Sequence, residues 1–456
     1  MKTKIKHAVL VYVILWALGF VIVVLLLSRG DRSLLDSAKF FFEIADNRNF
    51  LIGFHVIFLL CYALFLGAKH FIRVYHSRGK GIALKQISYR FALPLVLIFV
   101  GYKTLVFANA YEGFSYQWDT SAMNETGVVN NLYEVDQKHR GMSVFGWSKD
   151  NTKAIDDLVR ANVEWVAVVP FLFQKSERTK LVDIPDNPKI YTRRDSSHIR
   201  AILDLHQKGI RVQLKPHLRM HDGWRSNITL DSAKEWDAWF ESYRTNMLRY
   251  ARIAAETNTE LFCIGTELKT SIKKQPEKWN SLVDEIRQIY KGELTYAANW
   301  YDEYEHITFW NKLDYIGIQA YFPLTKEENP DLETIEKGWE KHLKTLKIFH
   351  KKHEKPILFT EAGYKSDADA TIKPWEWSPF LSGITKKKSD RTQQLAYEAL
   401  FKQTWNKPWL AGIYFWEWDT RTTEESAKTD INFSPRFKPA ENVMAKWFGK
   451  NSNDKL

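Results

Sequence analysis

The chain has 456 residues, 45% hydrophobic and 26% charged, which suffices for the core of one wide domain or two ordinary ones. Its net charge of +11 lies almost entirely in residues 1–110, where 14 Lys and Arg face 4 Asp and Glu, whereas the other 346 residues carry 51 against 50. The larger part therefore has no basic excess with which to bind nucleic acid. The two cysteines, Cys61 and Cys263, lie far apart in apolar runs and exclude a disulfide framework.

Residues 1–108 have the pattern of a membrane segment with about three transmembrane helices. Three apolar runs occur there, Ala8–Leu27, Leu51–Gly67 and Phe91–Phe107. The first has 20 residues without a charge, long enough to cross a bilayer core of about 30 Å, and no small-residue cleavage site follows it. The third contains Pro94 and Lys103, so a helix lying in the membrane interface is its alternative.

The charges that flank these runs predict their orientation. The N-terminus carries Lys2, Lys4 and Lys6, and residues 68–90 carry six basic side chains and no acidic one, whereas residues 28–50 hold four of each sign. By the positive-inside rule, the N-terminus and the 68–90 loop are cytoplasmic. With three spans, everything after residue 110 lies outside the cytoplasm, as in a multi-pass protein of a bacterial inner membrane. With only two spans, the same part lies in the cytoplasm.

Residues 109–135 show no clear period and are predicted to be a linker, and residues 451–456 form a polar tail. Between them, residues 136–450 alternate short apolar strands with amphipathic helices. Eight such units over about 300 residues predict a (β/α)₈ barrel rather than a doubly wound sheet, and no Gly-rich phosphate loop follows the first strand. The predicted strands start at Gly141, Val163, Ile210, Glu260, Leu294, Tyr315, Pro356 and Gly412.

Two of the intervening helices have recognisable starts. Ser232 and Glu235 have the spacing of a capping box ahead of an apolar stripe. Asp195 or Ser196 is the expected N-cap of the helix that stops at Gly209, just before the third predicted strand.

Two predicted strands end in a glutamate. The apolar run of LFCIGTELKT ends at Glu267, and that of PILFTEAGY ends at Glu361. The 94 residues between them equal three strand–helix units of about 31 residues, which places Glu267 after the fourth strand and Glu361 after the seventh. Reactive groups of such barrels lie at these C-terminal strand ends, so we expect both carboxylates at the barrel mouth.

Two carboxylates that face each other there are what a retaining glycosidase requires. One protonates the leaving oxygen while the other, about 5 to 5.5 Å away, attacks the anomeric carbon. The negative charge of the partner raises the pKa of the acid, so that one group stays protonated while the other is ionised. The structural alternative is that each glutamate caps the next helix or pairs with a lysine such as Lys269 or Lys365.

The motifs LFCIGTELKT, LTYAANW, LDYIGIQAYFPL and FTEAGYKS, in this order, resemble glycoside hydrolase family 113. The resemblance covers roughly residues 141–449 and implies a clan-A (β/α)₈ barrel that acts on β-mannans. It matches Glu267 to the acid/base and Glu361 to the nucleophile. Many clan-A enzymes have Asn directly before the acid/base, where this chain has Thr266. The membrane segment is not part of the resemblance.

Several side chains at or just beyond predicted strand ends are expected to bind the sugar. Flat aromatic rings suit the apolar C–H face of a pyranose, and polar groups past the third strand can reach its hydroxyls or orient Glu267. Core packing is the alternative for the aromatic residues, among which Trp416 is the preferred candidate because it ends the eighth strand. The predicted substrate-binding residues are Trp416, Trp300, Asn299, Tyr321, His217, Trp224, Asp222 and Arg219.

Two further features of the sequence suggest alternative site residues. Glu417 is a rival carboxylate, but strand alternation directs Trp416 and Glu417 to opposite sides, so only one of them can face the cleft. His217 and His221 are four residues apart, yet they follow a strand, where helical spacing does not apply, and no HExxH pattern accompanies them. We therefore expect no metal and no other cofactor.

Two functions of different classes fit these observations. The first is a membrane-anchored retaining β-glycoside hydrolase that acts outside the cytoplasm on a β-linked polysaccharide or oligosaccharide, such as β-1,4-mannan, by double displacement. The second is a non-catalytic glycan-binding or assembly protein that has kept the barrel. A binding module does not need both Glu267 and Glu361, so the pair favours the enzyme. The expected partners are a carbohydrate and the membrane, and no pattern in the sequence predicts an oligomeric state.

Overall fold

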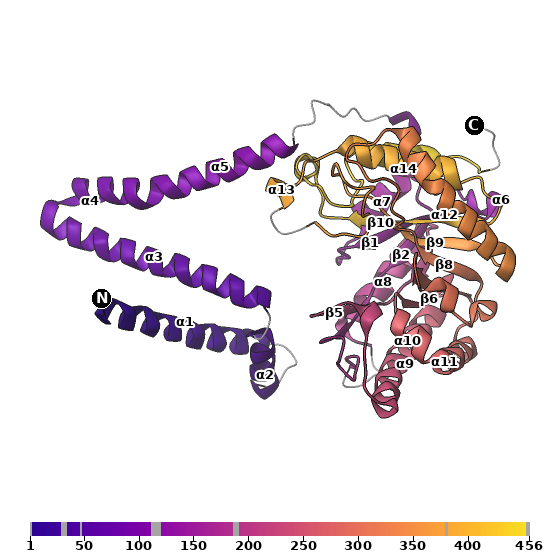
Figure 1. Cartoon of the computed structure of the whole chain (residues 1–456), viewed down its shortest axis with the longest axis horizontal. Helices are drawn as coiled ribbons and strands as arrows, with labels where there is room; N and C mark the ends of the chain where they lie inside the picture. Colours follow the sequence, from indigo (N-terminus) through magenta and orange to yellow (C-terminus); the bar gives the residue numbers. More distant parts are fainter. Residues whose placement is uncertain are drawn as a thin grey trace. The chain divides into compact units, whose positions relative to one another are not determined.

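The computed structural model describes residues 2–28, 34–45, 48–110, 120–185, 191–378 and 382–452. Its internal contacts divide the chain into two compact units, Met1–Thr104 and Leu105–Leu456 (Figure 1). The last four residues of the predicted polar tail lie outside the described residues.

The N-terminal segment is helical in its described residues apart from Gly79, which lies between two helices. Three stretches in it are long and apolar enough to cross a membrane, Val9–Leu26, Gly53–Arg78 and Lys80–Ala110. They coincide with the three apolar runs of the sequence. The helices are α1 (Lys2–Ser28), α2 (Leu34–Ala45), α3 (Arg48–Arg78), α4 (Lys80–Ile87) and α5 (Leu93–Ala110), with the π-helical turn η1 (Ser88–Ala92) between the last two.

The third stretch is a continuous helical segment despite its proline. Pro94 is the second residue of α5, and Leu93 separates it from the π-helical turn η1. A proline ring inside a regular α-helix meets the carbonyl four residues earlier, and a wider π turn gives that ring room. At 1.5 Å per residue the 31 residues from Lys80 to Ala110 span about 46 Å, more than the bilayer core of about 30 Å.

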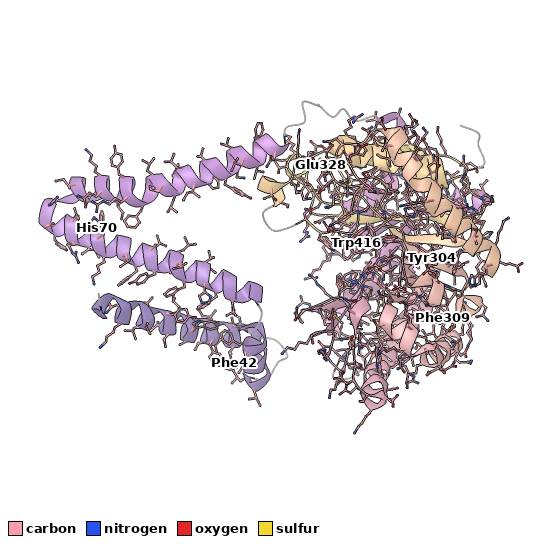
Figure 2. All side chains as sticks on the ribbon, in the orientation of Figure 1. Phe42, His70, Tyr304, Phe309, Glu328 and Trp416 are labelled. Carbon is pink, nitrogen blue, oxygen red and sulfur yellow. The ribbon has the colours of Figure 1, made fainter. Side chains whose placement is uncertain are left out.

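Aromatic side chains join the helices of this unit. Tyr12 of α1 packs edge-on against Phe58 of α3 at 5.0 Å, and Phe20 packs against Phe41 of α2 at 5.1 Å. At the turn between α3 and α4, His70 hydrogen-bonds Gln86 at 2.9 Å (Figure 2). Helix α2 was not expected, because its stretch of balanced charges carries no long apolar run.

The larger unit is a closed barrel of eight parallel strands, as the sequence predicts (Figure 1). Neighbours around the barrel follow the order β1-β2-β4-β6-β7-β8-β9-β10, and β10 closes on β1. The chain therefore folds as a (β/α)₈ TIM barrel. The strands are β1 (His139–Phe145), β2 (Trp165–Val168), β4 (Arg211–Leu214), β6 (Leu261–Thr266), β7 (Glu293–Asn299), β8 (Tyr315–Gln319), β9 (Ile357–Ala362) and β10 (Leu410–Asp419).

The barrel strands are apolar on both sides because one side faces the interior and the other faces the helices. In β2, Trp165 and Ala167 pack with Leu261 in a cluster of inward-pointing side chains. Val166 and Val168 point the other way, into the large core beneath the helices. This two-sided burial explains why the strands appear in the sequence as continuous apolar runs.

Seven of the eight strands are followed by an α-helix outside the barrel. After β7, where residues 300–314 are all described, the chain forms two 3₁₀ turns instead, η4 (Tyr304–His306) and η5 (Trp310–Lys312) (Figure 2). Phe309 between them stacks on Trp279 of α11 at 5.9 Å. The seven helices are α7 (Thr152–Arg160), α8 (Arg193–Gln207), α9 (Ala233–Glu256), α11 (Pro276–Ile289), α12 (Leu332–His353), α14 (Asp390–Thr404) and α16 (Pro439–Phe448).

Shorter elements lie in the connections. Strands β3 (Phe171–Gln174) and β5 (His217–Met220) pair in parallel as a small second sheet, just beyond the C-terminal ends of β2 and β4. The short helices are η2 (Thr120–Ala122), α6 (Tyr133–Asp136), η3 (Arg225–Asn227), α10 (Lys269–Lys274), α13 (Ser382–Thr385) and α15 (Glu424–Ala427).

One predicted helix start is wrong and another is confirmed. Helix α8 begins at Arg193 with Thr192 as its N-cap, in place of Asp195 or Ser196. The Thr192 side chain accepts the N–H of Asp195 at 3.2 Å, and the Asp195 carboxylate accepts the N–H of Thr192 at 2.7 Å. Asp195 therefore completes a capping box from inside the helix. Ser232 is the N-cap of α9, as expected, but the Glu235 carboxylate accepts the Asp231 N–H, so the predicted capping box is not completed.

The end of the predicted linker is attached to the barrel. The backbone N–H groups of Leu132 and Tyr133 donate to the buried Glu164 carboxylate at 2.6 and 2.8 Å. Residues 111–119 of this linker lie outside the described residues.

Candidate active site

The two glutamates lie where the strand count places them. Glu267 directly follows β6, the fourth barrel strand, and Glu361 lies near the end of β9, the seventh. Both are almost fully buried, with 5% and 4% exposure. The lysine pairs of the structural alternative do not form, because Lys269 pairs with Asp302 and Lys365 with Asp367.

Glu361 is surrounded by one buried cation and two further polar groups. The fully buried Lys215 ammonium, just past β4, donates to Glu361 Oε1 at 2.6 Å. The Tyr321 hydroxyl, past β8, donates to Oε2 at 2.9 Å. His217 Nε2 lies 3.3 Å from Oε1. Three different strands therefore hold this carboxylate, and a lysine side chain faces it directly.

His217 is neutral in this setting. Burial lowers the pKa of its imidazole well below the usual 6.5, and the positive charges of Lys215 and Arg225 lower it further. Its ring lies parallel to the Trp416 indole, at 5.7 Å and an angle of 3°. His217 therefore contacts both the Glu361 carboxylate and the Trp416 indole, and it adds no second positive charge to the site.

Glu267 has different surroundings. Its carboxylate accepts a hydrogen bond from Arg225 Nη2 at 2.5 Å, and its backbone carbonyl accepts one from the Ser226 hydroxyl at 2.7 Å. Its backbone N–H donates to the Ala297 carbonyl at 2.9 Å. The residue has φ = +55°, a left-handed conformation that is uncommon for a side chain other than glycine. Hydrogen bonds to the backbone N–H and C=O of Glu267 thus stabilise this left-handed turn, which sets the direction of its carboxyl.

Burial has the largest influence on the Glu267 carboxyl and raises its pKa. The Arg225 guanidinium lowers this pKa and the negative charge of Glu361 raises it again, with a net upward shift. The two carboxylates are therefore close enough to interact electrostatically. A carboxyl that keeps its proton beside one that is paired with a lysine can donate that proton while its neighbour acts as a base or nucleophile.

Comparison with models of known protein families identifies the family of this chain. The model of glycoside hydrolase family 113 matches residues 142–438. The chain is a member of glycoside hydrolase family 113. As a family 113 protein with an intact pair of buried glutamates, it is a glycosidase, which confirms the resemblance seen in the sequence motifs.

Solved structures of the family match along almost their whole length. A family 113 β-1,4-mannanase is 26% identical, covers 68% of this chain and 97% of its own, and has a TM-score of 0.59. The family 113 β-mannanase AaManA from Alicyclobacillus acidocaldarius, solved in complex with ManMIm, is also 26% identical, with the same coverages and a TM-score of 0.60. No curated protein sequence matches the chain.

Aromatic side chains line the mouth of this family 113 barrel next to the glutamates. Trp416, in β10, is 7% exposed and packs with Tyr321 and the buried Phe433 in one cluster (Figure 2). Trp300, past β7, packs against the same cluster. Trp375 lies 5.5 Å from the Trp300 ring and is 41% exposed, so the aromatic surface continues outward from the glutamates.

The other predicted binding residues fall into two groups. Asn299 is buried behind Glu267, and its side-chain NH₂ donates to the Ser226 hydroxyl and to Glu303. Arg219, Asp222 and Trp224 are exposed beyond β4.

The exposed group has local contacts. Arg219 lies over the Phe171 ring at 5.5 Å, the Asp222 N–H donates to the Lys175 carbonyl, and the Arg225 guanidinium lies over Trp224 at 4.5 Å. His217, Arg219 and Asp222 had been expected to bind sugar hydroxyls or to orient Glu267, and the side chain that pairs with Glu267 is Arg225.

Glu417 and the histidines can now be placed. Burial raises the pKa of Glu417 to about 7, and the charges of Asp419 and Glu361 add to this shift, so Glu417 is electrically coupled to the site. His221 is exposed and stacks on Phe173, away from the buried His217. Within the described ranges, no group of three or more His, Cys, Asp and Glu side chains could hold a metal ion.

Sequence reasoning missed Lys215, Arg225 and Trp375. Lys215 had a usable signal, because it directly follows the third predicted strand, at the same kind of C-terminal strand end as the glutamates. Arg225, in the 3₁₀ turn η3, and Trp375, in a turn after β9, lie in connections where the sequence pattern does not specify which strand end a side chain meets.

Proposed function

We propose that this family 113 protein is a retaining β-glycosidase with Glu361 as nucleophile and Glu267 as acid/base. The observation that carries the assignment is the difference between the two carboxylates. Glu361 faces the buried Lys215 ammonium and the Tyr321 hydroxyl, and burial raises the pKa of Glu267. The first setting suits an ionised carboxylate that attacks carbon, and the second suits a proton donor.

The reaction runs in two steps. A Glu361 oxygen attacks the anomeric carbon, the glycosidic C–O bond breaks, and Glu267 gives its proton to the departing oxygen. Glu267, now ionised, takes a proton from water while the water oxygen attacks the same carbon and releases Glu361. Lys215 and Tyr321 stabilise the carboxylate that leaves. Two displacements at one carbon leave the sugar with its original β configuration.

We propose a β-linked glycan as substrate, with β-1,4-mannan as the first polymer to test. The support is the β-1,4-mannanase identity of the solved relatives, which align over almost their whole length. The aromatic surface from Trp416 through Trp300 to Trp375 offers ring faces for successive pyranose units. The wild-type chain should release reducing ends from soluble β-1,4-mannan. Activity on another β-glycan alone would redirect the substrate assignment.

The role assignment is tested with two variants and azide. In Glu361→Ala the nucleophile is lost, so hydrolysis should fall by several orders of magnitude even when the leaving group is good. In Glu267→Ala an activated aryl mannoside should still react in its first step and accumulate as a glycosyl-enzyme.

Azide distinguishes the two losses. It should restore turnover of Glu267→Ala and give the β-glycosyl azide, whereas with Glu361→Ala it should attack directly and give the α product. Identical behaviour of the two variants, or an inverted wild-type product, would falsify the assignment. A chain that binds mannan without cleaving it would instead be the glycan-binding protein.

We further propose that the three apolar stretches span a membrane and that the barrel lies outside the cytoplasm. The continuous helix from Lys80 to Ala110 supports a third span over an interfacial helix, since it is long enough to cross. The basic side chains of residues 68–90 support placing this loop on the cytoplasmic side of the membrane. A reporter that is active only outside the cytoplasm should work when fused after Asn109 and stay silent when fused near Lys80. The reverse pattern would exclude this topology.

A further inference from the structure

Behind Glu267 lies a buried carboxylate that the reaction above does not use. Glu303 follows β7, in the segment that lacks an α-helix, and its side chain is fully buried. Among the described residues it forms no ion pair with a lysine, arginine or histidine. Its two oxygens accept three hydrogen bonds, one from the Tyr296 hydroxyl at 2.6 Å and two from Asn299.

The first oxygen leads to the residue after Glu267. Glu303 Oε1 accepts the Tyr296 hydroxyl proton, and the same hydroxyl oxygen accepts the backbone N–H of Leu268 at 2.8 Å. Because the Tyr296 hydroxyl donates its hydrogen to Glu303, the lone pairs of its oxygen face the Leu268 N–H. Glu303 therefore fixes the position of the group that accepts the Leu268 N–H.

The second oxygen leads to Glu267 itself. Glu303 Oε2 accepts both the backbone N–H and the side-chain NH₂ of Asn299, at 2.9 and 2.5 Å. The same NH₂ donates to the Ser226 hydroxyl at 3.0 Å, and that hydroxyl donates to the Glu267 carbonyl at 2.7 Å. Both hydrogens of the Asn299 amide are thereby used inside the protein, which favours a supporting role for Asn299 over donation to a sugar hydroxyl.

We infer that Glu303 is a positioning residue for the acid/base Glu267: two hydrogen-bond chains from its carboxylate hold the C=O and the N–H of the peptide bond between Glu267 and Leu268 and so fix where that carboxyl points. The inference rests on the proposed role of Glu267. The left-handed backbone of Glu267 needs such support, because this conformation is unfavourable for a residue with a side chain.

The charge of Glu303 adds a second effect on the same residue. Burial raises the pKa of Glu303 to about 7, and the hydrogen bonds from Tyr296 and Asn299 oppose this shift. The charge of Glu267 also raises the pKa of Glu303, and such an interaction acts equally in both directions. An ionised Glu303 therefore favours the protonated form of Glu267, the form that donates to the leaving oxygen.

The test is Glu303→Gln in the full-length chain. A glutamine amide has one accepting oxygen and one donating NH₂, so either Tyr296 or Asn299 loses its acceptor while side-chain size is kept. Misplacement of an acid by about 1 Å costs roughly 100-fold, so kcat on a β-1,4-manno-oligosaccharide should fall 10- to 100-fold with little change in KM.

A second substrate separates positioning from general damage. A 2,4-dinitrophenyl β-mannoside needs no protonation of its leaving group, and azide as acceptor needs no base, so this reaction should proceed in Glu303→Gln at the wild-type rate. Ser226→Ala, which breaks only one of the two chains, should show the same selective loss to a smaller degree. Equal loss on both substrates would overturn the inference, as would full activity of both variants on the oligosaccharide.

Glu441→Gln is the matched control. Glu441 is a buried carboxyl of α16 that accepts the Phe437 N–H at 2.6 Å and makes no contact with Glu267. Its substitution should leave the ratio of the two reactions at the wild-type value, whatever its effect on the melting temperature. If Glu267→Ala itself shows no dependence on the leaving group, the proposed function fails. If it shows that dependence and Glu303→Gln does not, only the role of Glu303 fails.

Discussion

The ends of strands β6 and β9 present the same side chain in two different surroundings. Glu361, on β9, meets a fully buried ammonium group and a phenol, and three strands contribute to its contacts. Glu267, after β6, meets one guanidinium, and most of its other contacts hold its backbone. At the same mouth of the barrel, the contacts of Glu361 thus supply an opposite charge, whereas those of Glu267 mainly set the direction of its carboxyl. Residue type alone does not distinguish the two glutamates, and their partners do.

The largest effect is expected from removing the cation at the β9 end. Lys215→Met leaves Glu361 buried without its cation, and loss of one preorganised electrostatic partner typically lowers kcat by about 100- to 1,000-fold. Breaking a buried pair also costs stability, about 3 to 5 kcal/mol. Steady-state kinetics of the purified variant measure the first effect, and thermal unfolding measures the second.

Lys365→Met controls for that stability loss. Lys365 is also buried and paired, with Asp367 at 3.0 Å, and it makes no contact with either glutamate. It should destabilise the chain and leave kcat close to wild type. Equal kinetic losses in the two lysine variants would show that Lys215 acts only through folding.

A smaller effect is expected at the same end from Tyr321→Phe. The hydroxyl donates to Glu361, and a hydrogen bond to a charged group contributes about 1.5 to 3 kcal/mol, or roughly 10- to 100-fold in rate. Tyr397→Phe is the control, because the buried Tyr397 hydroxyl has no hydrogen-bond partner among the described residues. A wild-type kcat for Tyr321→Phe would show that the Tyr321 hydroxyl does not contribute to the function of Glu361.

At the β6 end, the expected change is in pH dependence. In the proposed mechanism the first step requires protonated Glu267, so activity should fall as the pH rises through its pKa. Arg225 lowers this pKa, so Arg225→Gln should raise it and move the alkaline limb of kcat/KM to higher pH. The profile is measured with an oligosaccharide, and Arg219→Gln serves as control because Arg219 does not contact Glu267. A limb that moves to lower pH would contradict the assignment of the acid.

The smallest effect is expected from Glu417→Gln. Glu417 interacts with Glu361 electrostatically but contacts neither glutamate through a described hydrogen bond, so kcat should stay within about threefold, well under 1.4 kcal/mol. A loss as large as that of Glu267→Ala, with the same dependence on the leaving group, would make Glu417 the acid.

Much of this comparison was accessible from the sequence. A parallel strand buried on both sides must be apolar, so a carboxylate at its last position is conspicuous, and the regular length of strand–helix units gave the strand numbers of Glu267 and Glu361. The same logic applied to Lys215 would have found the cation. By contrast, Arg225 and Trp375 reach the site through loops, whose path depends on what they pack against.

Local exceptions to the barrel pattern were not predictable in the same way. The segment after β7 has no α-helix and instead buries aromatic rings such as Phe309. Glu303 lies in this segment, and nothing in the neighbouring sequence predicts that its acidic side chain is buried. The N-cap of α8 was misplaced by three residues because Asp195 suits both the cap and the third helical position.

The left-handed backbone at Glu267 also has a consequence for selection on this enzyme. A residue with a side chain in that region costs about 1 kcal/mol or more relative to glycine, and the buried carboxyl adds its own desolvation. Glu267→Gly, although inactive, should therefore melt at a higher temperature than Glu267→Ala. The chain gives up folding stability at the position where the proposed mechanism needs a fixed proton donor, so mutation without selection for activity would drift toward glycine there.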